Sequence, residues 1–234
     1  KYNYEKKYLS KVNSIIVTNE ATKKHYVKEY TISTNKIKVI PQGYNQQVFK
    51  PKKKSAENPS IVISYAGRFY KKLRDPEPFF MALERINLNR KEFQLEVFGN
   101  TGIDTYTNYP DANIILKGKF NQESLVDELH KTDILLFIDN AYGIQTSGKI
   151  YELLALEMPL IFIYQNQKSE LFKEIYQNSS NVFFCKNDVT SIYNMLTRIL
   201  KFRQNNKTIP KAIYPHYKYK WSELIKEFEN FIKD

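Results

Sequence analysis

Short apolar runs alternate along this chain with longer segments in which apolar residues recur every three or four positions. The short runs have strand length and are rich in β-branched and aromatic side chains, which is typical of strands buried in a sheet. We expect strands at residues 14–18, 36–40, 61–65, 94–98, 113–116, 134–138, 160–164 and 181–185, and helices at residues 20–30, 76–88, 149–156, 170–177, 189–202 and 221–232. Because strands and helices alternate, the sequence predicts an α/β fold, a Rossmann-like parallel sheet with helices on both faces.

Two helices have recognisable start signals. Asn121 is the predicted N-cap of a further helix, and Asp75 is the predicted N-cap of the helix at 76–88. Pro76 then takes the first helical position, where its missing N–H group has no cost.

A stretch at residues 51–59 has the composition of a linker, with prolines, charged residues and no apolar periodicity. It separates residues 1–50 from a main domain at 60–208, and residues 209–234 follow as a C-terminal segment that contains an amphipathic helix. A chain of 234 residues is expected to form one main domain with smaller attached pieces.

The formal net charge of +11 limits the classes of partner. A solvated basic surface, an anionic membrane face, a phosphorylated ligand and nucleic acid all fit a basic chain. The charges are spread along the sequence, with neither an arginine-rich stripe nor an RNA-recognition signature, so we expect no nucleic-acid partner. The single cysteine, Cys185, excludes an intrachain disulfide and fits a reducing compartment.

Glycines lie at or just beyond the ends of several predicted strands, namely Gly43, Gly67, Gly99, Gly118 and Gly143. In α/β sheets ligands bind beyond the carboxyl ends of the strands. The glycines are either simple turn formers or residues that let the backbone approach one ligand closely.

The first candidate binding loop follows the strand at 61–65 and contains Arg68, Lys71, Lys72 and Arg74. Cations close to the N-terminus of a helix repel one another and the helix dipole unless an anion lies among them. A diphosphate fits that requirement, and guanidinium groups bind it well. The alternative is a solvated basic loop.

The second candidate loop, residues 143–152, leads from the strand at 134–138 into a helix. Thr146, Ser147 and Gly148 are small residues whose N–H groups can face a phosphate. Glu152 lies about one turn into the helix, where its carboxylate can accept bonds from two neighbouring sugar hydroxyls. Alternatively, Glu152 only offsets the helix dipole.

The order of these features resembles glycosyltransferase family 4, the group 1 retaining enzymes with two Rossmann-like domains in the GT-B arrangement. Thr132-Asp-Ile-Leu-Leu-Phe137 resembles the family's "aDvlv" strand, and Ser147-Gly-Lys-Ile-Tyr-Glu152 resembles its "s.K.yE" segment. Further similar segments occur in family order at residues 14–19, 36–45, 49–51, 66–68, 96–99 and 116–120. The resemblance covers nearly the whole chain.

By this resemblance, Arg68 and a second cation bind the donor diphosphate. The family's usual spacing puts a lysine where this chain has Leu73, and Lys72 and Arg74 flank that position. We favour Arg74 over Lys72. Ser147 and Gly148 are the remaining expected diphosphate contacts.

The family also has two glutamates that lie eight positions apart. Glu152 matches the second, which binds the ribose, whereas the first falls on Ile144 and is absent here. Gln145 and Thr146 are therefore candidate sugar or base contacts. Gly67 and Gly118 are further candidates of the same kind, and no catalytic residue is identified.

The resemblance implies a retaining, metal-independent transfer of a hexose from a UDP-sugar or GDP-sugar to a glycan or lipid-linked glycan, as in polysaccharide biosynthesis. It implies no separate cofactor, and the absence of an Asp-x-Asp pair at a strand end predicts no catalytic divalent ion. We expect a cytoplasmic location with peripheral contact at the inner membrane face.

By the same resemblance, residues 1–50 are the last strand–helix–strand unit of the N-terminal domain, and residues 60–208 bind the nucleotide sugar. Residues 209–234 form the helix that crosses back, so we expect a donor-binding half whose N-terminal domain is missing. A sugar-nucleotide epimerase of the same fold is one alternative, which needs catalytic carboxylates and a histidine in the cleft. A non-catalytic basic module for membrane or nucleic acid is the other.

Overall fold

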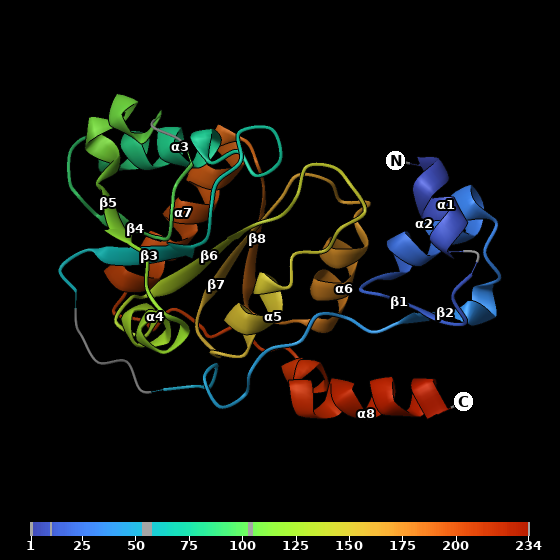
Figure 1. Cartoon of the computed structure of the whole chain (residues 1–234). Coiled ribbons are helices and arrows are strands. Elements are labelled where there is room, and N and C mark those ends of the chain that lie inside the picture. The colour runs from blue at the N-terminus through green and yellow to red at the C-terminus, as the bar shows by residue number, and fades with distance from the viewer. Residues whose placement is uncertain (1, 10, 53–57, 103–104, 234) are drawn as a thin grey trace.

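The computed structural model describes residues 2–9, 11–52, 58–102 and 105–233, and contains two parallel sheets (Figure 1). The larger sheet has the strand order β5-β4-β3-β6-β7-β8. Its strands are β3 (Ile61–Ala66), β4 (Phe93–Phe98), β5 (Ile114–Gly118), β6 (Ile134–Ile138), β7 (Leu160–Tyr164) and β8 (Val182–Lys186). The smaller sheet pairs β1 (Ile15–Val17) with β2 (Ile37–Val39). The predicted α/β fold class is confirmed.

Helices cover both faces of the larger sheet (Figure 1). They are α3 (Glu77–Asn87), α4 (Gln122–Leu129), α5 (Lys149–Leu154), α6 (Glu170–Asn178) and α7 (Val189–Gln204). Strand β6 shows why its sequence is apolar throughout: Leu135 and Phe137 pack with α4, α5 and α6, whereas Ile134, Leu136 and Ile138 pack with α3 and α7. A strand that is buried on both faces has no position for a polar side chain.

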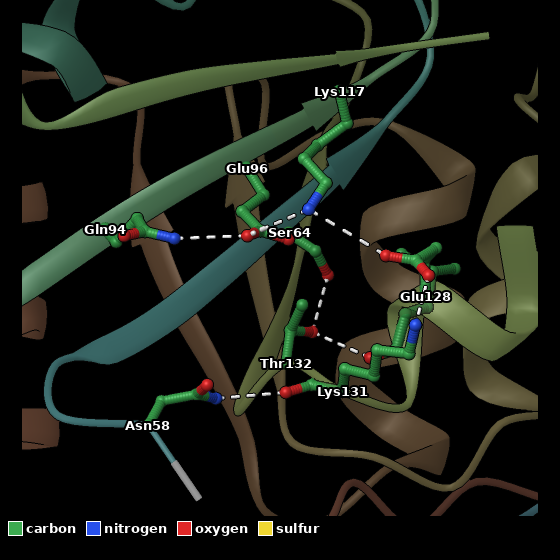
Figure 2. A network of polar contacts seen from close by, with 9 residues as sticks. Asn58, Ser64, Gln94, Glu96, Lys117, Glu128, Lys131 and Thr132 are labelled. Carbon is green, nitrogen blue, oxygen red and sulfur yellow. Dashed lines mark hydrogen bonds and ion pairs between the residues drawn. The ribbon is translucent and has the colours of Figure 1, made fainter. Parts of the chain in front are cut away.

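A cluster of polar side chains from β3, β4, β5 and α4 lies on one face of the larger sheet (Figure 2). Ser64 of β3 shares a 3.0 Å hydrogen bond with Thr132, and Lys117 lies 3.5 Å from Glu96 and 3.8 Å from Glu128. These polar side chains are hydrogen-bond partners for one another. Burying them without such partners would cost free energy. In β4, half-buried Gln94 and Glu96 alternate with buried apolar residues, so one face of this strand is only partly covered, whereas every residue of β3 is buried.

The N-terminal unit consists of α1 (Tyr2–Leu9), β1, α2 (Glu20–Tyr30) and β2. Its small core contains Ile15, Tyr30 and Ile37, and the Tyr30 hydroxyl donates a 2.6 Å hydrogen bond to Glu5. Helix α1 is absent from the sequence-based prediction because the described side chains of this helix are mostly exposed. Without a buried stripe, a helix shows no apolar periodicity.

The segment that follows the N-terminal unit, around Tyr44, pairs with a C-terminal segment around Tyr219. The Tyr44 backbone N–H donates to the Tyr219 carbonyl at 3.0 Å, and the Trp221 N–H donates to the Tyr44 carbonyl at 3.1 Å. Trp221 begins helix α8 (Trp221–Lys233). A Cβ at Gly43 would lie 2.7 Å from Leu224 of that helix, so glycine permits this close contact.

Several predicted boundaries differ slightly in the structure. The helix expected at 76–88 begins at Glu77 with Pro76 as its N-cap, so Asp75 is not the N-cap, although its carboxylate accepts a 3.1 Å hydrogen bond from the Glu77 N–H. The helix expected at 149–156 ends at Leu154. Asn121 caps α4 as predicted, accepting from the Ser124 N–H at 2.8 Å.

The division into residues 1–50, 51–59, 60–208 and 209–234 stays a prediction. Within the expected linker, residues 53–57 lie outside the part of the chain that the structure describes. No helix among the described residues combines the length and apolarity needed to cross a bilayer.

Candidate functional site

The larger sheet changes its direction of winding between β3 and β6. From β3 the chain continues to β4 and β5 on one side, and from β6 it continues to β7 and β8 on the other. The loops that leave the carboxyl ends of β3 and β6 are adjacent, because the Ala141 N–H donates to the Leu73 carbonyl at 2.8 Å. Such a reversal point is where open α/β sheets bind their ligands.

Two arginines of the β3–α3 loop converge on one aromatic ring. The Arg68 Cζ lies 5.4 Å and the Arg74 Cζ lies 5.5 Å from the centroid of Tyr70. The π face of Tyr70 offsets part of the repulsion between these like charges. Arg68 is exposed and Arg74 is half-buried, whereas Lys72 is exposed. The two cations can together hold an anion at this edge of the sheet.

Arg74 is held in place by groups from two other segments. Its Nε donates to the Asn140 Oδ1 at 2.8 Å, and the Asn140 Nδ2 donates to the Gln145 carbonyl at 3.0 Å. Burial raises the pKa of Tyr65 to about 12, and the neighbouring Arg74 opposes that shift. Arg74 is therefore linked to the loop that contains the second set of predicted site residues.

The glycines at the strand ends play two different roles. A Cβ at Gly99 would lie 2.8 Å from the Gly67 carbonyl oxygen, and one at Gly102 would lie 2.5 Å from Arg68 Nε. These glycines permit close approach between loops. Gly118 and Gly143 have open space around them and positive φ values of 79° and 94°, so they serve the turns themselves.

The loop at residues 143–148 is held by the N-terminal unit. The Asn19 side chain donates to the Ile144 carbonyl at 2.7 Å and to the Thr146 hydroxyl at 3.1 Å. A Cβ at Gly148 would lie 2.8 Å from the Gln42 Cβ and would overlap the Gln42 amide oxygen. Because Gly148 has no side chain, Gln42 can pack closely against it. The neighbouring Ser147 is half-buried.

Glu152 lies in the first turn of α5, as predicted, and forms an ion pair with Lys149 at 2.5 Å. The Glu152 side chain is 18% exposed. The same helix is anchored on its other side, where the Tyr151 ring stacks on Tyr219 at 3.8 Å. A ribose that bonds to Glu152 would have to share or displace Lys149.

Asp139 lies in the candidate site but was not predicted from the sequence. It follows β6 directly, is 3% exposed, and accepts hydrogen bonds from the Asn140 N–H at 2.8 Å and the Ser169 hydroxyl at 3.1 Å. Burial raises the pKa of this carboxyl. An acidic residue at the end of a fully apolar strand was the available signal.

A cleft of about 250 Å³ lies at this edge of the sheet, with Asp139 in its wall. Further polar lining comes from Asn140, Tyr142, Gln145, Thr146, Asn166 and Ser169. A larger cavity of about 750 Å³ lies at the opposite edge, near the amino ends of β3, β6 and β7. None of the predicted site residues lines that larger cavity, whereas Gln145 and Thr146 line the smaller cleft. We place the candidate site at the carboxyl edge, because the cations and the reversal of the sheet coincide there.

Within the described ranges, no three His, Cys, Asp or Glu side chains are grouped so that they could hold a metal ion. His130 is buried and its ring accepts a 3.0 Å hydrogen bond from the Lys52 N–H, so it has a structural role.

No family model matches this sequence, and no curated protein matches it. Solved structures do resemble it. Sucrose-phosphate synthase from Thermosynechococcus elongatus is 16% identical with a TM-score of 0.68, and the match covers 99% of this chain and 60% of that protein. HepE of Anabaena in complex with UDP and glucose is 11% identical with a TM-score of 0.66, covering 95% of this chain and 63% of HepE. A glycosyltransferase from Rickettsia africae is 15% identical with a TM-score of 0.65, covering 99% and 67%.

These likenesses establish the fold, a Rossmann-like α/β architecture of the kind found in GT-B glycosyltransferases. The chain spans about three fifths of the length of the first two structures.

Proposed function

We propose that this chain binds a nucleotide diphosphate sugar and forms the donor-binding part of a retaining, metal-independent hexosyltransferase. The acceptor in this proposal is a glycan or lipid-linked glycan. The observation that carries it is the convergence of Arg68 and Arg74 on Tyr70, at the point where the sheet reverses direction. A fold shared with glycosyltransferases supports it.

In the proposed complex, Arg68 and Arg74 bind the diphosphate and stabilise the charge that it gains as the leaving group. Lys72 contributes long-range attraction, because it is exposed on the same loop. The Ser147 and Gly148 amides are secondary contacts, since Gln42 lies against Gly148 in this structure.

Glu152 binds the ribose and thereby orients the donor. Gln145 and Thr146 contact the sugar in this proposal, which is supported by their position in the lining of the cleft beside Asp139. Gly67 and Gly118 allow the backbone to approach the base or sugar from the neighbouring strand ends.

A UDP-sugar is the first donor to test, because HepE resembles this chain and its structure contains UDP. The acceptor site is proposed to lie on further polypeptide, since the matched structures extend well beyond the part that aligns. The net charge of +11 supports peripheral contact with an anionic inner membrane face.

Ligand binding by the isolated chain tests the proposal. Thermal shift with UDP, GDP, ADP and their sugars should show selective stabilisation by one nucleoside diphosphate. Calorimetry should then give one site with shallow salt dependence. A basic module would instead bind heparin and other polyanions with steep salt dependence and without nucleotide selectivity. An epimerase would convert the free UDP-sugar in the absence of an acceptor.

A further inference from the structure

We propose that Asn140 is a positioning residue that orients the Arg74 guanidinium toward the diphosphate. This inference rests on the proposed function, because it assigns a partner to one of the two diphosphate-binding arginines. Asn140 lies directly after Asp139 at the carboxyl end of β6, and its Oδ1 accepts the Arg74 Nε–H at 2.8 Å.

The bond from Nε to Asn140 determines which edge of the Arg74 guanidinium can bind phosphate oxygens. An arginine has five N–H donors in a planar fork, and one of them, on Nε, is used by Asn140. The remaining four donors belong to the two terminal nitrogens, which form a bidentate edge suited to phosphate oxygens. An arginine without this tether would sample many rotamers and would lose that freedom only when the ligand bound.

The Asn140 side chain is itself held in one orientation. Its Nδ2 donates to the Gln145 carbonyl at 3.0 Å, and its backbone N–H donates to Asp139 Oδ1 at 2.8 Å. A flipped amide would place Nδ2 against the Arg74 donor and Oδ1 against the Gln145 acceptor. Both contacts would be repulsive, so the hydrogen-bond network itself assigns the amide orientation.

Gln165 directly follows β7 and bridges the loops that follow β3 and β6. The Gln165 Nε2 donates to the Leu73 carbonyl at 2.8 Å and to the Asp139 carbonyl at 2.9 Å. These carbonyls belong to the residues that immediately precede Arg74 and Asn140. The backbone positions of the arginine and its acceptor are thus tied together independently of their side-chain bond.

Because the Asn140 amide is neutral, it can hold Arg74 without cancelling the arginine's charge. An aspartate at position 140 would keep the acceptor and its bond to Arg74, but its charge would neutralise the arginine and repel a diphosphate. An asparagine orients the cation and leaves its charge available. The role therefore predicts that Asn140→Asp impairs diphosphate binding more than Asn140→Ala does.

The test is a double-mutant cycle, measured by calorimetry with UDP and with uridine as the probe that lacks phosphates. Asn140→Ala should weaken UDP binding by about 5- to 10-fold and leave uridine binding unchanged, a size typical of coupled neighbouring residues. In the Arg74→Ala background the same substitution should change UDP affinity by less than about 2-fold. Asn178→Ala, which removes an exposed amide on α6, is the matched control and should have no effect on UDP affinity.

Each outcome has one meaning. If the unaltered chain binds no nucleoside diphosphate, the proposed function and the positioning role of Asn140 are both wrong. If the unaltered chain binds UDP but Asn140→Ala does so equally well, the role of Asn140 alone is overturned. An equal loss with and without Arg74, an equal loss for UDP and uridine, or weaker binding by Asn140→Ala than by Asn140→Asp would overturn it too.

Discussion

Glu152 is the carboxylate that we propose binds the donor ribose, and in this structure it already has a partner. Lys149 lies 2.5 Å away in the same turn of α5, with its side chain 35% exposed. Replacing Glu152 by alanine removes the acceptor for the ribose hydroxyls. The same change releases Lys149, so the two effects must be weighed together.

The expected size follows from both contributions. Hydrogen bonds to a charged group contribute about 1.5–3 kcal/mol. Loosening a partly exposed ion pair offsets about 0.2–1 kcal/mol of that, because such pairs are weak. The net loss of about 0.5–2.8 kcal/mol corresponds to a roughly 2- to 100-fold weaker Kd for UDP. Glu152→Gln keeps the shape and some acceptor capacity, so its loss should be smaller.

Calorimetric titration with UDP and with inorganic pyrophosphate separates the interpretations, because pyrophosphate has no ribose. Glu152→Ala should weaken UDP binding and leave pyrophosphate binding nearly unchanged. Glu123→Ala removes an exposed acidic residue from the first turn of α4 and is the matched control. If Glu152 only offsets the helix dipole, its removal should change stability by at most about 1 kcal/mol and leave UDP affinity intact. Normal UDP binding by Glu152→Ala would therefore refute its assignment to the ribose.

Four further outcomes are expected. Arg68→Ala and Arg74→Ala should each weaken UDP binding more than about 10-fold without changing uridine binding, and equal losses for both ligands in calorimetry would argue against a diphosphate contact. UDP affinity should change less than about 10-fold with EDTA, and a larger loss would indicate a bound metal. Gly148→Ala should destabilise the fold by about 1–3 kcal/mol in denaturant titration, because its Cβ would overlap the Gln42 amide oxygen. Gln42→Ala should restore only part of the loss, because the Cβ of residue 42 would remain 2.8 Å from the new methyl group. Burial raises the pKa of Asp139, so the stability linked to its proton is present below the pKa of the unfolded chain and is lost as the pH rises through the pKa of the folded chain. The melting temperature of Asp139→Asn, measured relative to that of the unaltered chain, should therefore increase from pH 4 to pH 7. A decrease would contradict the burial argument.

The sequence by itself determined the α/β class and most strands of the larger sheet, but not the order in which those strands pair. The strands predicted at 134–138 and 160–164 have the observed bounds, because a run that is apolar at every position can be buried only where both faces are covered. Helix α2 also has its predicted bounds, 20–30. The two candidate loops were likewise located from the sequence, since glycines and small polar residues at strand ends mark the ligand edge of a parallel sheet.

Tertiary structure alone decided which of those loop residues act together. Asn140 and Arg74 are 66 positions apart in the chain, and Asn19 and Thr146 are 127 apart. Pairs with such separation leave no periodic trace in a single sequence, because periodicity reports which face of one element is buried and not which element lies opposite. The contact of Gln42 with Gly148 belongs to the same class, and so do the burial and raised pKa of Asp139. A side chain's partners and its electrostatic environment depend on how the loops of different strands meet at one edge of the sheet, and this is established only when the whole chain has folded.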